Sequence, residues 1–381
     1  MKRYKIVYDV TDELLKQALE LDKQVFSKLD IGDFDLCKSW LKINNQIYTF
    51  LLYNNKLIGY INFIRITDDC FSKFIQGKMK DYKLNDKDIL PFKKNEGNKC
   101  LFMSIAIAKE HRDTNAIIYL KKGFDKKLKK LKKQGVVISD TVIDCVSVDG
   151  VKFCIERLDA KYLTGSLNGK IYYTPNIYSK GRKVPNIKLE LLNKKNLKTA
   201  SIIQYQIFKK NWCGYCDYLK EVEQREKGIT NNLQLSFVIK YHKKIVGIIG
   251  LYELKQYPNV IWLNWFAILP KYRRRGIGTN ALFKIINIAR TFKRKEFRLV
   301  TYEVWNIQAQ DIYKKIMQLE EPYTNKNDWQ YAIKNGVAKI FSSNLFDKTV
   351  TKWNNKFIDL LSDHELHKNS IKKLKDDGLI N

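Results

Sequence analysis

The fold of this chain is indicated most clearly by the stretch Phe266-Ala-Ile-Leu-Pro-Lys-Tyr-Arg-Arg-Arg-Gly-Ile-Gly-Thr279. This stretch overlaps an apolar and aromatic run from Val260 to Leu269, which predicts a strand. Pro270 ends that strand, because proline has no N–H to donate to the ladder. Apolar residues then return with helical spacing at Ala281, Leu282, Ile285, Ile286, Ile288 and Ala289. The sequence therefore predicts a strand, a short basic loop and a helix in direct succession.

The basic loop has the composition of an anion-binding site. A helix start presents backbone N–H groups that lack intrahelical partners, and the helix dipole favours negative charge there. Gly276 and Gly278 have no side chains, so a pyrophosphate can approach the backbone closely. Arg273, Arg274 and Arg275 add positive charge. A glycine turn beside a solvated basic run is the alternative, but the order of strand, proline, arginines and apolar helix favours phosphate binding.

The pattern Arg273-x-x-Gly276-x-Gly278 resembles the acetyl-CoA pyrophosphate loop of the GNAT N-acyltransferases. Two further elements agree with this family in order and spacing. After a predicted strand from Phe297 to Val304, the segment Asn306-x-x-Ala309-x-x-Ile312-Tyr313 resembles the family's Asn-x-x-Ala-x-x-x-Tyr segment. Upstream, Leu235 to Leu254 predicts a hairpin that is also typical of the family. The resemblance covers roughly residues 187–320.

The resemblance implies a cofactor and a set of residues that hold it. Acetyl-CoA, or a related acyl-CoA, would be the acyl donor and would lie in a V between the strand ending at Leu269 and the strand starting at Phe297. One backbone amide of the first strand would polarise the thioester carbonyl. The residues expected to contact the cofactor are Phe266, Ile268, Arg273, Arg274, Arg275, Gly276, Ile277, Gly278, Thr279 and Asn306.

The same resemblance implies catalytic roles. Tyr313 would protonate the departing CoA thiolate, which requires a phenol within hydrogen-bond reach of the sulfur; an ordinary core tyrosine is the alternative. Glu253 is the candidate base for the amine, directly or through water, and Glu303 is the second candidate. Both residues also fit ordinary surface carboxylates. Holding the amine and the thioester together supplies much of the rate in such reactions, so no single base need be essential.

The first half of the chain repeats the pattern of the second. Leu57-Ile58-Gly59-Tyr60 matches Ile245-Val246-Gly247-Ile248 in a second predicted hairpin, and Arg112 falls where Arg273 falls. The offset is 247 − 59 = 188 at the glycines and 273 − 112 = 161 at the arginines, so the first half carries 188 − 161 = 27 extra residues. We place them at roughly residues 67–98, as an inserted loop.

The first copy has lost the residues of the phosphate loop. Asn115 stands in place of Gly276, and Ile117 stands in place of Gly278, where a branched side chain blocks backbone approach. Further along, Cys154 takes the place of the tyrosine. We therefore expect a degenerate copy that does not hold CoA. It would either form one wall of the substrate cleft or stabilise the other half.

The predicted fold class is α+β, with mixed sheets and flanking helices in two tandem GNAT-like domains. The predicted boundaries are 1–173 for the degenerate domain, 174–186 for a linker, 187–335 for the acetyltransferase domain and 336–381 for a helical C-terminal extension. The linker prediction rests on two of the chain's six prolines and a glycine in a stretch without periodicity. In the tail, Trp329–Ile333 is the segment that predicts a strand.

Composition bears on partners and location. The 381 residues carry a formal net charge of +30, which would suit a polyanionic partner such as RNA or the ribosome. A composition bias is the alternative, because lysines are spread along the whole chain. No apolar run is long enough to span a bilayer, and the first residues lack the apolar core of a signal peptide. Seven scattered cysteines fit reduced thiols, so we expect a cytoplasmic protein.

The segment Trp212-Cys213-Gly-Tyr-Cys216 resembles a thioredoxin motif but lacks its surroundings. It follows the first helix of an acyltransferase-like domain, and no second CxxC exists to complete a zinc site. We expect no metal, and we expect this segment either to line the acceptor cleft or to pack in the core.

Two functions follow from the sequence. The first is an acyl-CoA-dependent N-acyltransferase that moves an acetyl group to a primary amine by direct attack in the C-terminal domain. The alternative is a basic RNA- or ribosome-binding scaffold with a vestigial acetyltransferase fold. A pure scaffold has no reason to keep the phosphate loop together with Tyr313, so the sequence favours the enzyme.

Overall fold

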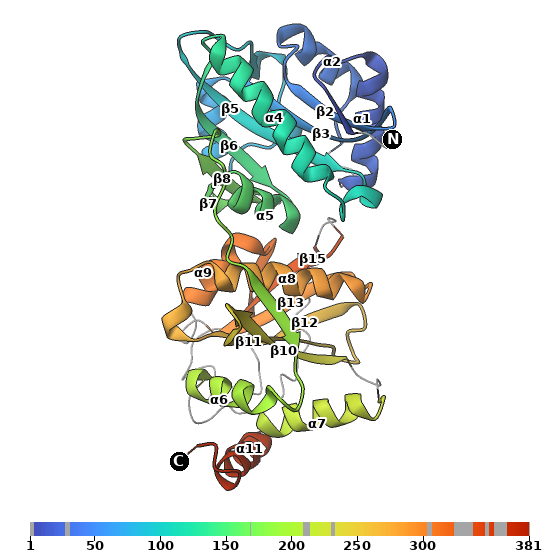
Figure 1. The fold of residues 1–381 in the computed structure, drawn as a ribbon. Coiled ribbons are helices and arrows are strands. Elements are labelled where there is room, and N and C mark those ends of the chain that lie inside the picture. The colour runs from blue at the N-terminus through green and yellow to red at the C-terminus, as the bar shows by residue number, and fades with distance from the viewer. Residues whose placement is uncertain are drawn as a thin grey trace. The chain divides into compact units, whose positions relative to one another are not determined.

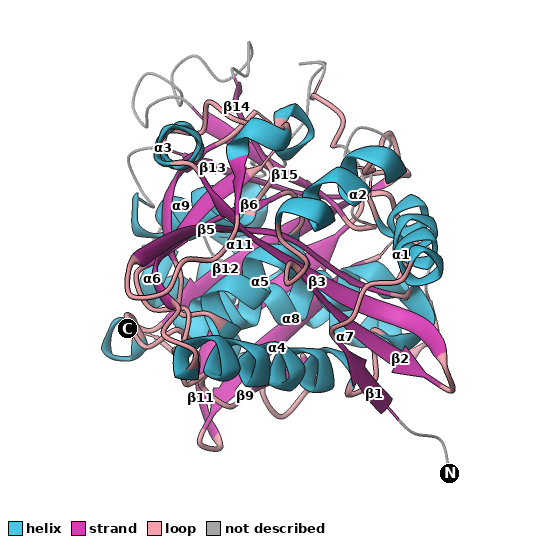
Figure 2. Ribbon diagram, turned by 90° about the horizontal axis from the view of Figure 1, so that it is seen from above, coloured by secondary structure: helices cyan, strands magenta, loops and turns pink. Residues whose placement is uncertain are grey.

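The chain is seen in a computed structural model that describes residues 4–26, 31–167, 169–208, 214–229, 233–302, 307–323, 338–346, 350–353 and 364–380. It divides into two compact units, of which the first ends at Arg182 and the second begins at Lys183 (Figure 1). Each unit is built on one mixed β-sheet, and helices and strands are interleaved along the chain (Figure 2).

The first unit contains the sheet of strands β1 to β8. Its strands are β1 (Tyr4–Val7), β2 (Tyr48–Tyr53), β3 (Lys56–Ile66), β4 (Ile89–Leu90), β5 (Gly97–Ile107), β6 (Val137–Cys145), β7 (Lys161–Gly165) and β8 (Lys170–Thr174). Its α-helices are α1 (Asp12–Val25), α2 (Phe34–Ile43), α3 (Asp68–Ile75), α4 (Ala116–Lys133) and α5 (Val148–Arg157). The strand order is β1-β2-β3-β5-β6-β8-β7, and β4 pairs with β3.

The second unit contains the remaining sheet. Its strands are β9 (Ile187–Leu191), β10 (Gln234–Tyr241), β11 (Lys244–Tyr252), β12 (Val260–Ile268), β13 (Glu296–Tyr302), β14 (Leu319–Tyr323) and β15 (Ala338–Asn344). Its described α-helices are α6 (Leu197–Phe208), α7 (Tyr215–Glu226), α8 (Ile277–Thr291), α9 (Ile307–Ile316) and α11 (His364–Asp376). The strand order is β14-β15-β13-β12-β11-β10-β9.

The two sheets have the same topology. Read from the first strand of each unit, both follow the same order, and both contain one parallel pair, β5 with β6 and β12 with β13. The other neighbours are antiparallel in both sheets. The predicted fold of two tandem copies is therefore confirmed.

The hairpins that open each copy turn at two residues with left-handed backbone. In the first unit Asn54 and Asn55 have φ of 49° and 63°, and in the second unit His242 and Lys243 have φ of 46° and 65°. Two positive φ values in a two-residue loop match the right-handed twist of the flanking strands. Asparagine adopts this conformation readily, whereas His-Lys gives no such signal in the sequence. The turn of the second hairpin lies where the sequence predicted it.

The inserted stretch of the first unit is more ordered than the predicted loop. It contains α3 and β4, and Thr67 caps α3 by accepting a hydrogen bond from the Cys70 N–H. Phe71 and Phe74 on α3 are 5% and 0% exposed. The prediction of a plain loop was wrong. Phe71 and Phe74 lie three positions apart and form a short buried face, but the Lys and Asp residues around them hide this pattern in the sequence.

The end of the second sheet also differs from expectation. The segment Ala338–Asn344 forms β15, which lies between β13 and β14, whereas a helical extension was predicted from residue 336. Ile340, Phe341, Ser342 and Ser343 are all 0% exposed, so half of this buried run consists of serines, whereas branched and aromatic residues are the ones enriched in strands. The strand predicted at Trp329–Ile333 lies outside the described residues.

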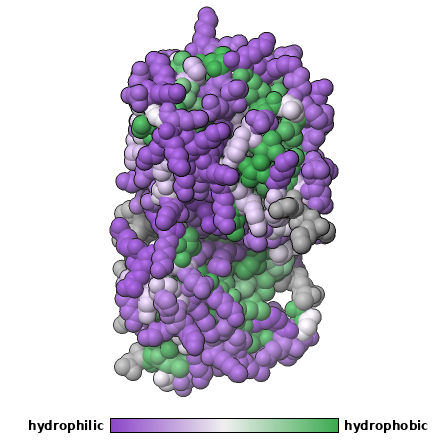
Figure 3. All heavy atoms as spheres, turned by 45° about the horizontal axis from the view of Figure 1, so that its top comes forward, coloured by the Kyte–Doolittle hydropathy of each residue, from purple (hydrophilic) through white to green (hydrophobic). Residues whose placement is uncertain are grey.

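In the second unit, helices cover both faces of the sheet. Figure 1 shows α6 and α7 on one face and α8 and α9 on the other. Side chains of α6, α7, β10, β11 and β12 form one apolar cluster on the first face. The surface has a different character: hydrophilic residues dominate the face shown in Figure 3, with apolar residues in scattered patches.

The core of the first unit holds a lysine. Lys127 on α4 is 6% exposed, and its Nζ donates a hydrogen bond of 2.7 Å to the carbonyl oxygen of Tyr48 on β2. Burial disfavours the charged ammonium and lowers the pKa of Lys127 to about 7. The side chain therefore changes charge near neutral pH in the folded protein.

We predict that Lys127→Met stabilises the first unit most at or below pH 7. Unfolded lysine titrates near pH 10.4, as is usual for this side chain, so between about 7 and 10 the unfolded chain holds a proton that the folded chain lacks. Wild-type stability then rises with pH across this window, and the advantage of the methionine shrinks. Urea unfolding at pH 6.5 and 9.5 measures the difference in free energy of unfolding between the wild type and Lys127→Met. The exposed Lys126→Met is the control. A stability difference that is the same at both pH values would contradict the assignment.

Candidate active site in the second unit

The strands β12 and β13 pair only at their beginnings. Val260, Ile261 and Trp262 of β12 stand opposite residues 296–298 of β13 in parallel register. Beyond Trp262, β12 continues its ladder with β11, and β13 continues its ladder with β15. The two strands thus diverge, as the family resemblance implied, and beyond Trp262 no strand among the described residues pairs with β12 on its β13 side.

A β-bulge lies in the diverging part of β12. Gly250 pairs with Asn264 and Ile248 pairs with Ala267, so one residue of β11 faces two of β12. Within this bulge Trp265 has φ of 38°, which is a strained value for a bulky side chain. Its indole packs against the ring of Phe208 on α6 with centroids 5.2 Å apart. The bulge therefore re-aims the backbone of β12 in the part where β12 and β13 diverge.

The loop after β12 leads into a helix start with free donors. Pro270–Tyr272 form one 3-10 turn, and Gly276, with φ of 74°, is the residue that caps α8. Among the described residues, no acceptor is recorded for the backbone N–H groups of Ile277, Gly278 and Thr279, while Asn280 N–H bonds to the Gly276 carbonyl. Three donors and the positive end of the helix dipole are thus available to an anion.

Gly278 lies directly over the bulged strand. A Cβ added to it would stand 3.4 Å from Cζ of Phe266 and 3.7 Å from Cγ1 of Ile268. A methyl group would be in ordinary contact, but a longer side chain would have to displace these residues or fill the space above the helix start. That Gly278 lets a pyrophosphate approach the backbone stays a prediction.

The three arginines of the loop differ in what they do. Arg273 Nε donates to the carbonyl oxygen of Ile268 at 2.9 Å, and in the first unit Arg112 Nε donates to Ile107 at 3.2 Å. The shared bond ties the loop to the end of the strand in both copies. Arg274 and Arg275 have exposed side chains. The structure therefore gives Arg273 a contact with the end of β12 and places the guanidinium of Arg275 5.7 Å from the ring centroid of Tyr272.

The corresponding loop of the first unit has a different backbone. Within residues 109–117, all of which are described, no residue has a positive φ. The Ala116 N–H at the start of α4 donates to Thr114 Oγ1 at 3.1 Å, so one N–H group of this helix start already has an acceptor. Ile117 occupies the position of Gly278. The first copy thus lacks both the left-handed turn and the open backbone of the second.

Tyr313 lies on α9, which follows β13. The side chain is 5% exposed, and its ring centroid is 6.4 Å from that of Phe266 and 5.5 Å from that of Phe341. Burial raises the pKa of Tyr313 well above its usual value, so the phenol stays protonated across the physiological range. The structure therefore brings Tyr313 together with the bulged strand. Asn306 and Glu303 lie outside the described residues.

Glu253 is not brought to the same place. Its carboxylate accepts two hydrogen bonds from the guanidinium of Arg294, at 2.6 and 3.3 Å. The preceding Tyr252 pairs with Trp262, at the closed end of the diverging strands. At about 3.3 Å per residue, Phe266 lies roughly 13 Å further along β12. The ion pair and this distance separate Glu253 from Phe266 and Tyr313.

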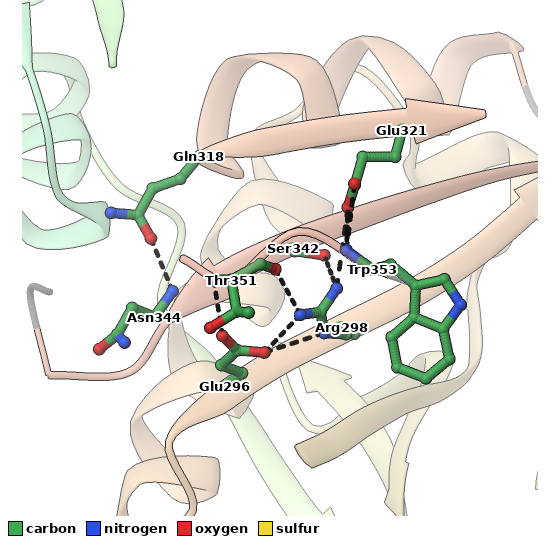
Figure 4. A network of polar contacts seen from close by, with 8 residues as sticks. All are labelled: Glu296, Arg298, Gln318, Glu321, Ser342, Asn344, Thr351 and Trp353. Atoms are coloured by element: carbon green, nitrogen blue, oxygen red, sulfur yellow. Dashed lines mark hydrogen bonds and ion pairs between the residues drawn. The ribbon is translucent and has the colours of Figure 1, made fainter. Parts of the chain in front are cut away.

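A buried polar network at the closed end was not visible in the sequence (Figure 4). Arg298 on β13 is 2% exposed and donates to Glu296, to Ser342 Oγ at 2.9 Å and to the Thr351 carbonyl at 2.6 Å. Its guanidinium lies 5.0 Å from the ring centroid of Trp353. The network fastens residues 351–353 to the sheet. An arginine within a strand gives no sequence signal for burial, because its partners are up to 53 residues away.

The described part of the chain contains no group of three or more His, Cys, Asp or Glu side chains that could hold a metal ion. Cys213 lies outside the described residues. Cys216 is the second residue of α7, where its N–H donates to Ser370 Oγ at 3.0 Å. None of the described helices combines the length and apolar character needed to cross a membrane.

Residues 203–317 match the acetyltransferase (GNAT) family. The match lies within the second unit, which therefore contains a GNAT acetyltransferase domain, and acetyl-CoA is the acyl donor that such domains use. No curated relative matches the chain. The family match gives no support to RNA as a partner.

Solved structures of similar proteins belong to the same class. Spermidine N-acetyltransferase from Vibrio cholerae, in complex with CoA and spermine, has 15% identity and a TM-score of 0.33, and the match covers 42% of this chain and 95% of that chain. An acetyltransferase of the GNAT family from Staphylococcus aureus has 22% identity and a TM-score of 0.31, with 42% and 99% covered. These values are too low to transfer a substrate to this chain.

The two loops predict one acetyl-CoA site per chain. We expect calorimetric titration of the full-length protein with acetyl-CoA to saturate at one molecule per chain, because, of these two loops, it is the one before α8 that has the open backbone and the three available donors. Replacing both Asn115 and Ile117 with glycine should leave the stoichiometry at one, since Asp113 and Thr114 still stand where the second copy has Arg274 and Arg275. Two molecules bound per wild-type chain would contradict the difference drawn between the copies.

Proposed function

We propose that the second unit transfers an acetyl group from acetyl-CoA to a primary amine by direct attack, with no acyl-enzyme intermediate. The observation that supports this most strongly is the continuous run from β12 into α8. It places a bulge beside an open strand edge, and a helix start with three free N–H groups follows within a few residues. The first feature suits a thioester and its pantetheine arm, and the second suits a pyrophosphate.

In this proposal the start of α8 holds the pyrophosphate. The N–H groups of Ile277, Gly278 and Thr279 donate to it, and the left-handed Gly276 sets their direction. The exposed side chains of Arg274 and Arg275 neutralise the charge of the phosphates. Arg273 has a structural role, because its hydrogen bond to the Ile268 carbonyl oxygen keeps the loop against the end of β12.

The unpaired edge of β12 would hold the pantetheine arm. Beyond Trp262 this edge has no strand partner, so an extended amide-containing chain can add to it as a further strand would. Phe266 and Ile268 are the residues proposed to pair with it, together with Asn306 from the segment before α9. A backbone amide in the bulge would donate to the thioester carbonyl, whose oxygen gains negative charge as the amine attacks.

Tyr313 is the proposed acid that protonates the departing thiolate. Burial raises its pKa, so the phenol carries its proton at neutral pH and has an O–H to donate. The amine must lose a proton as well. Because Glu253 is held in an ion pair with Arg294, we assign most of the rate to the alignment of amine and thioester and leave Glu253 at most an indirect role through water.

We predict that Gly278→Glu abolishes acetyl-CoA binding and leaves the fold intact. The new side chain has no room toward Phe266, so it must occupy the space above the helix start, where its negative charge repels the phosphates. Calorimetry should show a loss of affinity of at least 100-fold. The matched control is Asn287→Glu, which adds the same charge to an exposed position further along α8. Binding that survives Gly278→Glu would mean that the pyrophosphate lies elsewhere.

We predict that Tyr313→Phe lowers kcat at least 10-fold and changes acetyl-CoA affinity less than threefold. The substitution removes only the hydroxyl, and the contacts of the ring with Phe266 and Phe341 remain. Release of the CoA thiol, followed with a panel of primary amines, measures turnover, and calorimetry measures the affinity. Unchanged turnover would show that Tyr313 is a core residue without a role as acid.

A further inference from the structure

The tail of the chain returns to the second unit and packs on α7. Tyr215 at the start of α7 donates its hydroxyl to Asp377 Oδ2 at 2.7 Å, across 162 residues of sequence. The Cys216 N–H donates to Ser370 Oγ on α11 at 3.0 Å. Leu374 on α11 is 0% exposed. The helix α11 is therefore fixed by both polar and apolar contacts to the point where α7 begins.

The apolar contacts of α11 continue to the bulged strand. One cluster of buried side chains contains Leu374 of α11, Tyr215 of α7 and Ala267 of β12. Trp265 and Phe208 are partly buried and pack against the same cluster. The cluster thus connects the tail, through the two helices of this face, with the residue whose backbone forms the bulge.

The backbone of Trp265 needs this support. A bulky residue with φ of 38° is strained, and such strain persists only where the surrounding packing imposes it. The packing here includes the 5.2 Å ring contact with Phe208, the last residue of α6. If α11 leaves, α7 loses its partners at Leu374 and Asp377, and the cluster that holds the indole loses one side.

We propose that α11 is a positioning element of the acyl-transfer site, with Leu374, Tyr215 and Asp377 as its positioning residues. By completing the cluster, α11 keeps α6 and α7 against β12 and so keeps the bulge in the shape that aims its amide at the thioester. The phosphate loop has contacts of its own, the bond from Arg273 to the Ile268 carbonyl and the left-handed turn at Gly276, so α11 should affect it less than the bulge. This inference rests on the proposed function for its catalytic consequence.

The test compares Leu374→Asp with Asn369→Asp in the full-length protein. Both add one negative charge to α11, but Leu374 is buried and Asn369 is exposed. Hydrogen exchange should become at least 10-fold faster in peptides covering residues 260–268 for Leu374→Asp and stay unchanged for Asn369→Asp. Acetyl-CoA affinity should change less than threefold, while kcat with a primary amine such as spermidine, used as a probe, should fall at least 10-fold.

Milder variants keep the test decisive if Leu374→Asp does not fold. Tyr215→Phe removes only the bond to Asp377 and should change exchange and kcat in the same direction by twofold to fivefold, whereas Leu374→Met should restore both to wild-type values. Wild-type exchange at residues 260–268 in Leu374→Asp or Tyr215→Phe would overturn the proposal, as would equal losses of acetyl-CoA affinity and kcat. If the wild-type protein acetylates no amine tested, the proposed function fails, and the exchange measurement alone decides the role of α11.

Discussion

The geometry of the second unit depends on the point where β12 and β13 stop pairing. Their parallel register ends at Trp262, and from there each strand is held only by its other neighbour. An unpaired strand edge in the middle of a sheet is costly unless something pairs with it, because backbone N–H and C=O groups require partners when they are buried. In the proposed function, an extended amide chain such as pantetheine adds to this edge as a further strand would.

The strain in this region is supported from both faces of the sheet. On one face, Arg273 ties the loop to the carbonyl of Ile268, and Gly278 allows α8 to lie close to the bulge. On the other face, the apolar cluster of α6, α7 and α11 holds Trp265. At the closed end, Arg298 and Glu296 fasten the chain that continues toward α11. Removing either partner of this buried pair would leave an uncompensated charge, which is strongly destabilising.

The sequence predicted the features that depend on residues close together in the chain. Pro270 ends a strand, Gly276 permits a left-handed turn, and the apolar spacing after it forms α8; each effect acts within a few residues. The features that escaped prediction depend on distant partners. Ser342 and Ser343 lie buried in β15 because β13 and β14 flank them, and Arg298 is buried because residues 351–353 cover it. Glu253 was chosen by its position in the hairpin, but its partner Arg294 lies 41 residues away.

The central claim is that acetyl-CoA lies along the end of β12 and the start of α8, and that the first copy does not bind it. The most direct measurement is hydrogen exchange of the full-length chain with and without CoA. We predict slower exchange in peptides covering residues 263–280 and no change in those covering 103–118. Slower exchange in the first unit, or no change in residues 263–280 at saturating CoA, would contradict the account.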